Sequence, residues 1–126
     1  MQVKIEFEGE ATIETSRDLQ YLKQRMEEDC PVSILEEKQP TISGEKDSGL
    51  MVGMTIASLA LGAIQTAIAV LQYWQSQRPK YKILIQFRNE RYILDNASKE
   101  EVNKVVDAIR ALSASTEEIE IIVSKR

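Results

Sequence analysis

The chain of 126 residues contains no histidine and a single cysteine, Cys30. Without histidine, Ser-His and Cys-His catalysis, histidine-ligated metal sites and a histidine pH switch are all excluded. One cysteine forms neither an internal disulfide nor a cysteine-based zinc site. Because acidic neighbours such as Asp29 make a thiolate nucleophile less favourable, we expect Cys30 to be a small buried apolar residue.

Prolines and glycines are also few, three and five respectively, which excludes collagen-like and Pro/Gly-rich disordered chains. The length favours a single domain spanning residues 1–126. With 16 basic and 20 acidic residues, the net charge of −4 argues against a nucleic-acid partner. The basic and aromatic residues between 73 and 92 could contact nucleic acid or anionic lipid, but their alternation favours the exposed face of a strand instead.

The sequence also offers few candidates for catalytic, metal-binding or phosphate-binding residues. The acidic clusters at 27–29, 36–37 and 117–118 have no calcium-loop spacing, and we interpret them as solvated surface charge. The glycines follow neither the phosphate-loop nor the dinucleotide-binding pattern. The sequence therefore predicts a protein that is not an enzyme, with no catalytic residue, no cofactor and no metal site.

The most unusual feature is a long stretch without charge. No charged residue occurs between Asp47 and Arg78, a gap of 30 positions, and 16 of the 22 residues from Leu50 to Leu71 are aliphatic, Met or Ala. The apolar residues surround the helical wheel, so this pattern differs from that of a surface amphipathic helix. We predict one long apolar helix over residues 49–77, about 43 Å long at ~1.5 Å per residue.

Three interpretations of this predicted helix remain open. It could cross a membrane, with Tyr73 and Trp74 in the interfacial belt. It could be the core helix of a small domain, covered by a sheet. It could also be shared with a second chain through small residues that permit close backbone approach. A helix longer than its own domain exposes apolar surface, which is typical of an interface. We therefore select as interface candidates Gly53, Ala57, Ala60, Ile64, Ala67, Tyr73 and Trp74.

The segments on either side of this helix resemble each other. Residues 1–35 predict a strand over 3–7, a turn, a short strand over 11–13, a helix ending near Glu28 and a strand over 32–35. Residues 36–48 form a polar loop. Residues 80–124 predict strands at 81–87 and 92–94, a helix that begins at Ser98 and a strand at 119–123. Either duplication or convergence explains an offset of 80 that relates Val3, Ile5, Phe7, Glu10 and Ile13 to Ile83, Ile85, Phe87, Glu90 and Ile93.

A family resemblance follows from this order of features. An alternating strand and a short helix precede the residues Ser48-Gly49-Leu50-Met51-Val52-Gly53, an apolar helix rich in small residues, Tyr73-Trp74 and a basic turn. A strand pair, a helix and a short end complete the chain. In this order it resembles the small bacterial proteins called the effector-associated constant component, first family. The resemblance implies an accessory protein of bacterial conflict systems, encoded beside proteases or other effectors and nucleotide-dependent regulators.

We therefore expect an α+β fold in which two ββαβ-like halves are joined by one long apolar central helix. The expected function is a non-catalytic adaptor, scaffold or self-assembling interaction module that couples a sensor to an effector. Its partners would be an effector or regulator protein, a second copy of the chain, or both. We expect the protein to be located in the cytoplasm. The alternative is a single-pass protein or pore-forming effector component of the inner membrane, with residues 50–74 spanning the bilayer.

Overall fold

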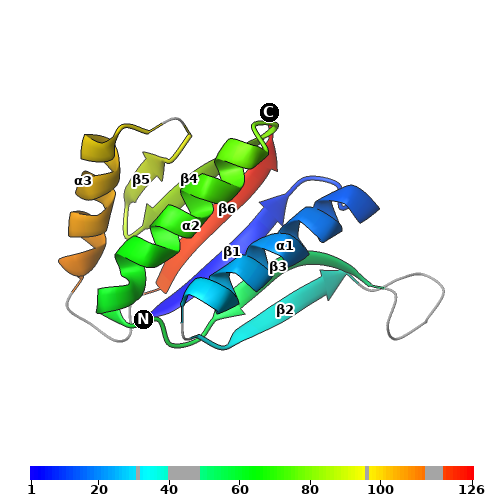
Figure 1. The fold of residues 1–126 in the computed structure, drawn as a ribbon, viewed down its shortest axis with the longest axis horizontal. Helices are drawn as coiled ribbons and strands as arrows, with labels where there is room; N and C mark the ends of the chain where they lie inside the picture. The colour runs from blue at the N-terminus through cyan, green and yellow to red at the C-terminus, as the bar shows by residue number, and fades with distance from the viewer. Residues whose placement is uncertain (31, 40–48, 96, 113–117) are drawn as a thin grey trace.

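The computed structural model of the chain describes residues 1–30, 32–39, 49–95, 97–112 and 118–126. These residues form one six-stranded mixed sheet and three α-helices (Figure 1). The expected α+β class is therefore confirmed. In chain order the elements are β1 (Gln2–Glu8), α1 (Ile13–Asp29), β2 (Ile34–Gln39), β3 (Leu50–Ile56), the 3-10 turn η1 (Leu61–Ala63), α2 (Ile64–Gln77), β4 (Tyr81–Phe87), β5 (Glu90–Ile93), α3 (Lys99–Arg110) and β6 (Glu118–Lys125).

The strand order across the sheet is β2-β3-β1-β6-β4-β5. The last strand, β6, lies between β1 and β4 and joins the two ends of the chain in one sheet. β1 and β6 are parallel, whereas the other neighbouring pairs are antiparallel. The two termini of the chain thus contribute central strands, and neither half completes its sheet alone.

The three helices cover one face of this sheet. A small apolar cavity in the core is lined by residues of all three helices, among them Met26 of α1, Ala67 of α2 and Ile109 of α3, together with Ile5 and Ile121 of the sheet. Alternate residues of the strands are buried on this side, as the period of two requires. None of the three described helices covers the opposite face of the sheet.

The predicted long helix over 49–77 is wrong. Residues 50–56 form the strand β3, which pairs with β1 on one side and with β2 on the other. Only residues 64–77 form an α-helix, α2. The proposed bilayer span over 50–74 is therefore half strand and loop, and among the described residues no helix is long and apolar enough to cross a membrane.

The local sequence explains why this segment divides. A continuous apolar run can be a strand buried between two others as readily as a helix, because periodicity alone does not distinguish them. Val52, Thr55 and Ile56 are β-branched and favour the pleated surface of a sheet. Gly53 lies at a register irregularity where Val52 is an extra residue of β3 opposite Glu37 and Lys38.

The prediction of two equivalent ββαβ-like halves is also not supported. The C-terminal half has the expected order β4, β5, α3 and β6. In the N-terminal half, however, the second strand expected at residues 11–13 is absent, because Thr12 caps α1 and Ile13 begins it. Ile13 is therefore helical whereas Ile93, its counterpart at the offset of 80, lies in a strand. Residues 36–39 of the predicted loop belong to β2, and 40–48 lie outside the described residues.

Gly53→Ala tests the strand assignment directly. In the observed strand, a Cβ at residue 53 would lie 2.6 Å from the carbonyl oxygen of Ile5 and 3.4 Å from Glu6 Cα. We expect this substitution to lower the free energy of unfolding by about 1–3 kcal/mol in a urea titration. A helix at this position would give the opposite sign, a gain of about 1 kcal/mol. Gly62→Ala is the matched control, because its Cβ meets no atom within 4 Å, and we expect no loss of stability.

Candidate protein-binding face

The exposed surface of α2 is the most distinctive surface of the helical layer. α2 lies between α1 and α3 (Figure 1). Its inner side buries mainly apolar residues against the sheet, including Ile68, Leu71 and Trp74. Its outer side presents short, amide and aromatic side chains, which we call the α2 face: Gln65, Thr66, Ala69, Tyr73, Ser76 and Gln77.

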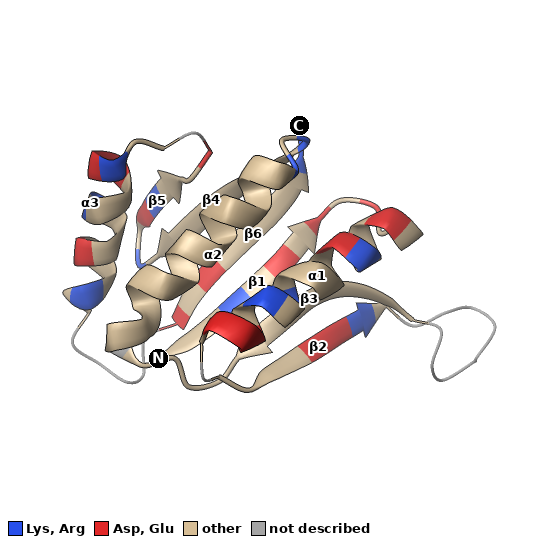
Figure 2. Cartoon of the chain, in the orientation of Figure 1, with Lys and Arg blue, Asp and Glu red and all other residues tan. Residues whose placement is uncertain are grey.

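The α2 face has no charge because the uncharged stretch before Arg78 includes the whole helix. Figure 2 shows α2 without acidic or basic residues over its length, between the charged helices α1 and α3. α1 has five acidic and three basic residues, a net charge of −2, and α3 has three of each sign. An uncharged centre with an aromatic residue and a charged border is the composition typical of protein–protein interfaces.

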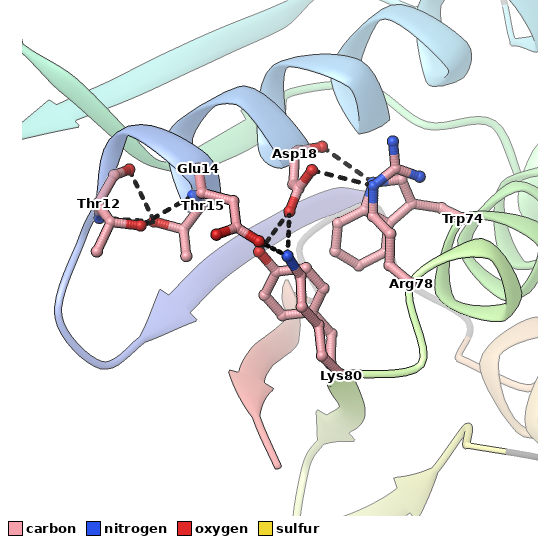
Figure 3. A network of polar contacts seen from close by, with 8 residues as sticks. Thr12, Glu14, Thr15, Asp18, Trp74, Arg78 and Lys80 are labelled. Atoms are coloured by element: carbon pink, nitrogen blue, oxygen red, sulfur yellow. Dashed lines mark hydrogen bonds and ion pairs between the residues drawn. The ribbon is translucent and has the colours of Figure 1, made fainter.

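One end of the α2 face is held in place by Asp18 of α1. The indole Nε1–H of Trp74 donates to the Asp18 carbonyl oxygen at 2.9 Å. Arg78 Nε donates to Asp18 Oδ1 at 3.2 Å, and the Tyr81 hydroxyl donates to Oδ2 at 2.6 Å. Lys80 Nζ lies 3.4 Å from the same Oδ2 and also pairs with Glu14 (Figure 3). A single residue of α1 therefore fixes the end of α2 and the start of β4.

We call Asp18 and the four residues that contact it, Trp74, Arg78, Lys80 and Tyr81, the Asp18 cluster. This cluster has the properties of a structural anchor. The Tyr81 side chain is 1% exposed and stacks on Trp74, with ring centroids 5.1 Å apart. Burial, followed by the hydrogen bond to Asp18 and its negative charge, raises the pKa of Tyr81 above the ordinary 10.0, while the Arg78 charge acts in the opposite direction. A phenol with a raised pKa is a weaker acid and stays neutral at physiological pH. The hydroxyl thus serves as a hydrogen-bond donor.

Two arginine side chains pack on aromatic rings near the same end of α2. Arg78 lies over the rings of Tyr21 and Trp74, with its guanidinium carbon 4.6 and 5.6 Å from their centroids. Arg25 lies 5.6 Å from the centroid of Tyr73, which is 53% exposed. These cation–π contacts favour one orientation of the two exposed rings, those of Tyr21 and Tyr73. Exposed aromatic residues are well suited to anchor a partner protein.

The candidate interface residues chosen from the sequence do not form one stripe. Gly53 is buried in β3, and Ile64, Ala67 and Trp74 are buried under α2. Ala57 and Ala60 are exposed in the connection between β3 and η1, and Tyr73 is exposed on the α2 face. The common side expected for these residues depended on one continuous helix, which β3 interrupts. The role of the three exposed residues stays a prediction.

Other residues of the α2 face, including Gln65, Thr66 and Ala69, were not selected from the sequence. Their signal was already visible, because a surface helix without charge is unusual in a chain that is 29% charged. The predicted helix over 49–77 also included the residues of β3, so the exposed side of α2 was not recognised. Cys30, expected to be buried, is 2% exposed, and burial followed by the charge of Asp29 raises its pKa. Among the described residues, no group of three or more acidic or cysteine side chains is arranged to hold a metal ion.

No protein-family model matches the chain, and neither the search of curated proteins nor the search of solved structures found a match. Its function must therefore be inferred from geometry, charge and the resemblance carried by its sequence.

Asp18→Ala tests the anchor. The substitution leaves the buried Tyr81 hydroxyl without its acceptor, and we expect the free energy of unfolding to fall by about 1–3 kcal/mol. Adding Tyr81→Phe should recover part of this loss, because no buried hydroxyl is then unpaired. Glu14→Ala is the matched control, since Glu14 also pairs with Lys80 but is exposed, and its effect should stay within about 0.5 kcal/mol. Equal losses for Asp18→Ala and Glu14→Ala in urea titrations would contradict the anchor role.

The raised pKa of Tyr81 predicts a pH dependence. Its stabilising effect is fully present below the unfolded-state pKa of about 10 and is lost as the pH rises through the higher folded-state value. Thermal melting above about pH 10 should therefore show a smaller fall in stability for Tyr81→Phe than for the unmodified chain. Tyr92, whose pKa is also raised, is present in both proteins and does not affect the difference. Identical pH profiles would show that Tyr81 ionises as readily in the folded as in the unfolded chain.

Proposed function

We propose that this protein is a non-catalytic adaptor or scaffold that binds a partner protein through the α2 face. The observation that carries the proposal is the uncharged outer side of a central helix, with an exposed aromatic residue, between two charged helices. A helix on a surface that contacts only water usually carries charged residues on its outer side. Binding a partner gives a physical reason for their absence here, because burying an unpaired charge is costly.

The resemblance of the sequence to the effector-associated constant component, first family, supports the same role. It implies an accessory protein encoded beside an effector, such as a protease, and a nucleotide-dependent regulator. We accordingly propose that the occupant of the α2 face is one of these two proteins and that the adaptor helps couple a sensor to an effector. The proposed site of action is the cytoplasm.

The charges around the α2 face constrain the partner. α1 ends in Glu27, Glu28 and Asp29, and its net charge is negative. Lys23 and Arg25 neutralise part of this cluster through ion pairs of 3.5–3.7 Å. We expect the partner to place an uncharged surface on α2 and basic residues opposite the end of α1.

Ala69→Arg tests this proposal. The residue is exposed near the middle of α2, so the substitution should change the free energy of unfolding by no more than about 0.5 kcal/mol. The chain is co-expressed separately with the product of each adjacent gene, and binding is measured by co-purification and titration. We expect one of these proteins to bind and Ala69→Arg to weaken binding by more than about tenfold.

Ala111→Arg is the matched control, because it introduces the same side chain at an exposed alanine outside the α2 face, at the end of α3. It should bind as the unmodified chain does. The proposal fails if no adjacent gene product binds, or if the two arginine variants bind equally well.

A further inference from the structure

The face of the sheet opposite the helices has a row of three aliphatic side chains. Leu84 of β4 pairs with Ile93 of β5 on one side and with Ile122 of β6 on the other. Ile93 is 67% exposed, and Leu84 and Ile122 are half-buried. We call these three residues the aliphatic row. They lie side by side on adjacent strands, about 4.8 Å apart in the direction across the sheet.

In the next row, charges of opposite sign lie on the two sides of Gln86. Gln86 pairs with Arg91 of β5 on one side and with Glu120 of β6 on the other. The Gln86 amide donates to Glu120 Oε2 at 2.7 Å and so helps to orient that carboxylate. Positions two apart in a strand share a face, so this row borders the aliphatic row on the open side of the sheet. The order across β5, β4 and β6 is basic, neutral, acidic, and Lys4 of β1 lies next to Glu120.

This arrangement is complementary to itself. Consider two copies packed face to face about a two-fold axis. The axis runs parallel to β4 and passes directly over it, midway between the two sheets. The axis places each residue of β5 opposite a residue of β6 at the same height in the other copy. Leu84 then meets its own counterpart and Ile93 meets Ile122 of the other copy. In the next row, Arg91 meets Glu120 of the other copy, so three apolar contacts and two ion pairs form across the interface.

A two-fold axis displaced by half a strand spacing loses this match. An axis between β4 and β6 would bring Arg91 opposite Lys4, which pairs with Glu120 in the parallel β1–β6 register. When the axis lies at β4, Lys82 faces Lys82 of the other copy. Lys82 is exposed near the start of the strand, however, so its long side chain can remain in water. Sheets that pack face to face at about 10 Å commonly bury such rows of aliphatic side chains.

We propose that the chain forms a two-fold dimer through the open face of the sheet, with the aliphatic row at its centre and Arg91 paired with Glu120 of the other copy. The two helical layers then lie on the outside, and the dimer presents two α2 faces in opposite directions. This inference deepens the proposed function and rests on it for its biological consequence, because a dimeric adaptor brings two partner molecules into one assembly.

Leu84→Glu tests the centre of the dimer. The substitution would place the carboxylates of the two copies against each other in an apolar contact. The dimer dissociation constant, measured by analytical ultracentrifugation, should therefore rise by more than about tenfold. Leu35→Glu is the matched control, since Leu35 is 68% exposed on the same face but belongs to the distant edge strand β2. It should remain as dimeric as the unmodified chain.

A charge reversal tests the register of the two copies and does not depend on the stability of the Leu84 variant. Arg91→Glu and Glu120→Arg should each weaken the dimer, because each places like charges opposite one another. The double variant should restore it, since the ion pairs then form with reversed polarity. Restoration is expected only if these two residues meet across the interface.

Several outcomes would overturn the dimer. The dimer is ruled out if the unmodified chain stays monomeric up to about 1 mM, because a dissociation constant above this concentration is too weak to matter. Leu84→Glu could stay dimeric while folded, or the double charge reversal could fail to restore what each single change weakened. The proposed function is separable, because Ala69→Arg should weaken partner binding and keep the dimer, whereas Leu84→Glu should weaken the dimer and keep partner binding.

Discussion

The architecture depends on the pairing of the last strand with the first. β6 is parallel to β1 over seven residue pairs and antiparallel to β4 on its other side. Without β6, the strands β2-β3-β1 and β4-β5 would be two separate sheets, and the two-stranded sheet β4-β5 would be marginally stable at best by itself. The buried residues Ile119, Ile121 and Val123 extend one apolar surface across both parts. That continuous surface is what the three helices cover, and so it determines where α2 lies.

The uncharged stretch before Arg78 serves two different structural purposes. Its first part is β3, buried between two strands, where apolar side chains are required by packing. Its second part is α2, whose inner side is buried for the same reason. Packing does not explain the outer side of α2, where charged residues would be tolerated. The absence of charge at Gln65, Thr66 and Ala69 is therefore the part of the sequence that calls for a functional explanation.

The sequence predicted well those elements whose pattern has one interpretation. Alternation located β1, β4 and β6. The capping residue Ser98 located the start of α3. The long apolar stretch was misjudged because a buried strand and a buried helix have the same composition, and only the partners on both sides of β3 distinguish them. The Asp18 cluster joins residues more than 50 positions apart, so no local pattern could have revealed it.

The two proposals use opposite sides of the sheet and together describe a scaffold. One side would join two copies of the chain, and the other would bind a partner protein on each copy. Light scattering of the chain in complex with its adjacent-gene partner measures both claims at once, because the mass of the complex gives the number of each chain. The account predicts two copies of this chain with two partner molecules. A complex with a single copy of each chain would contradict the scaffold.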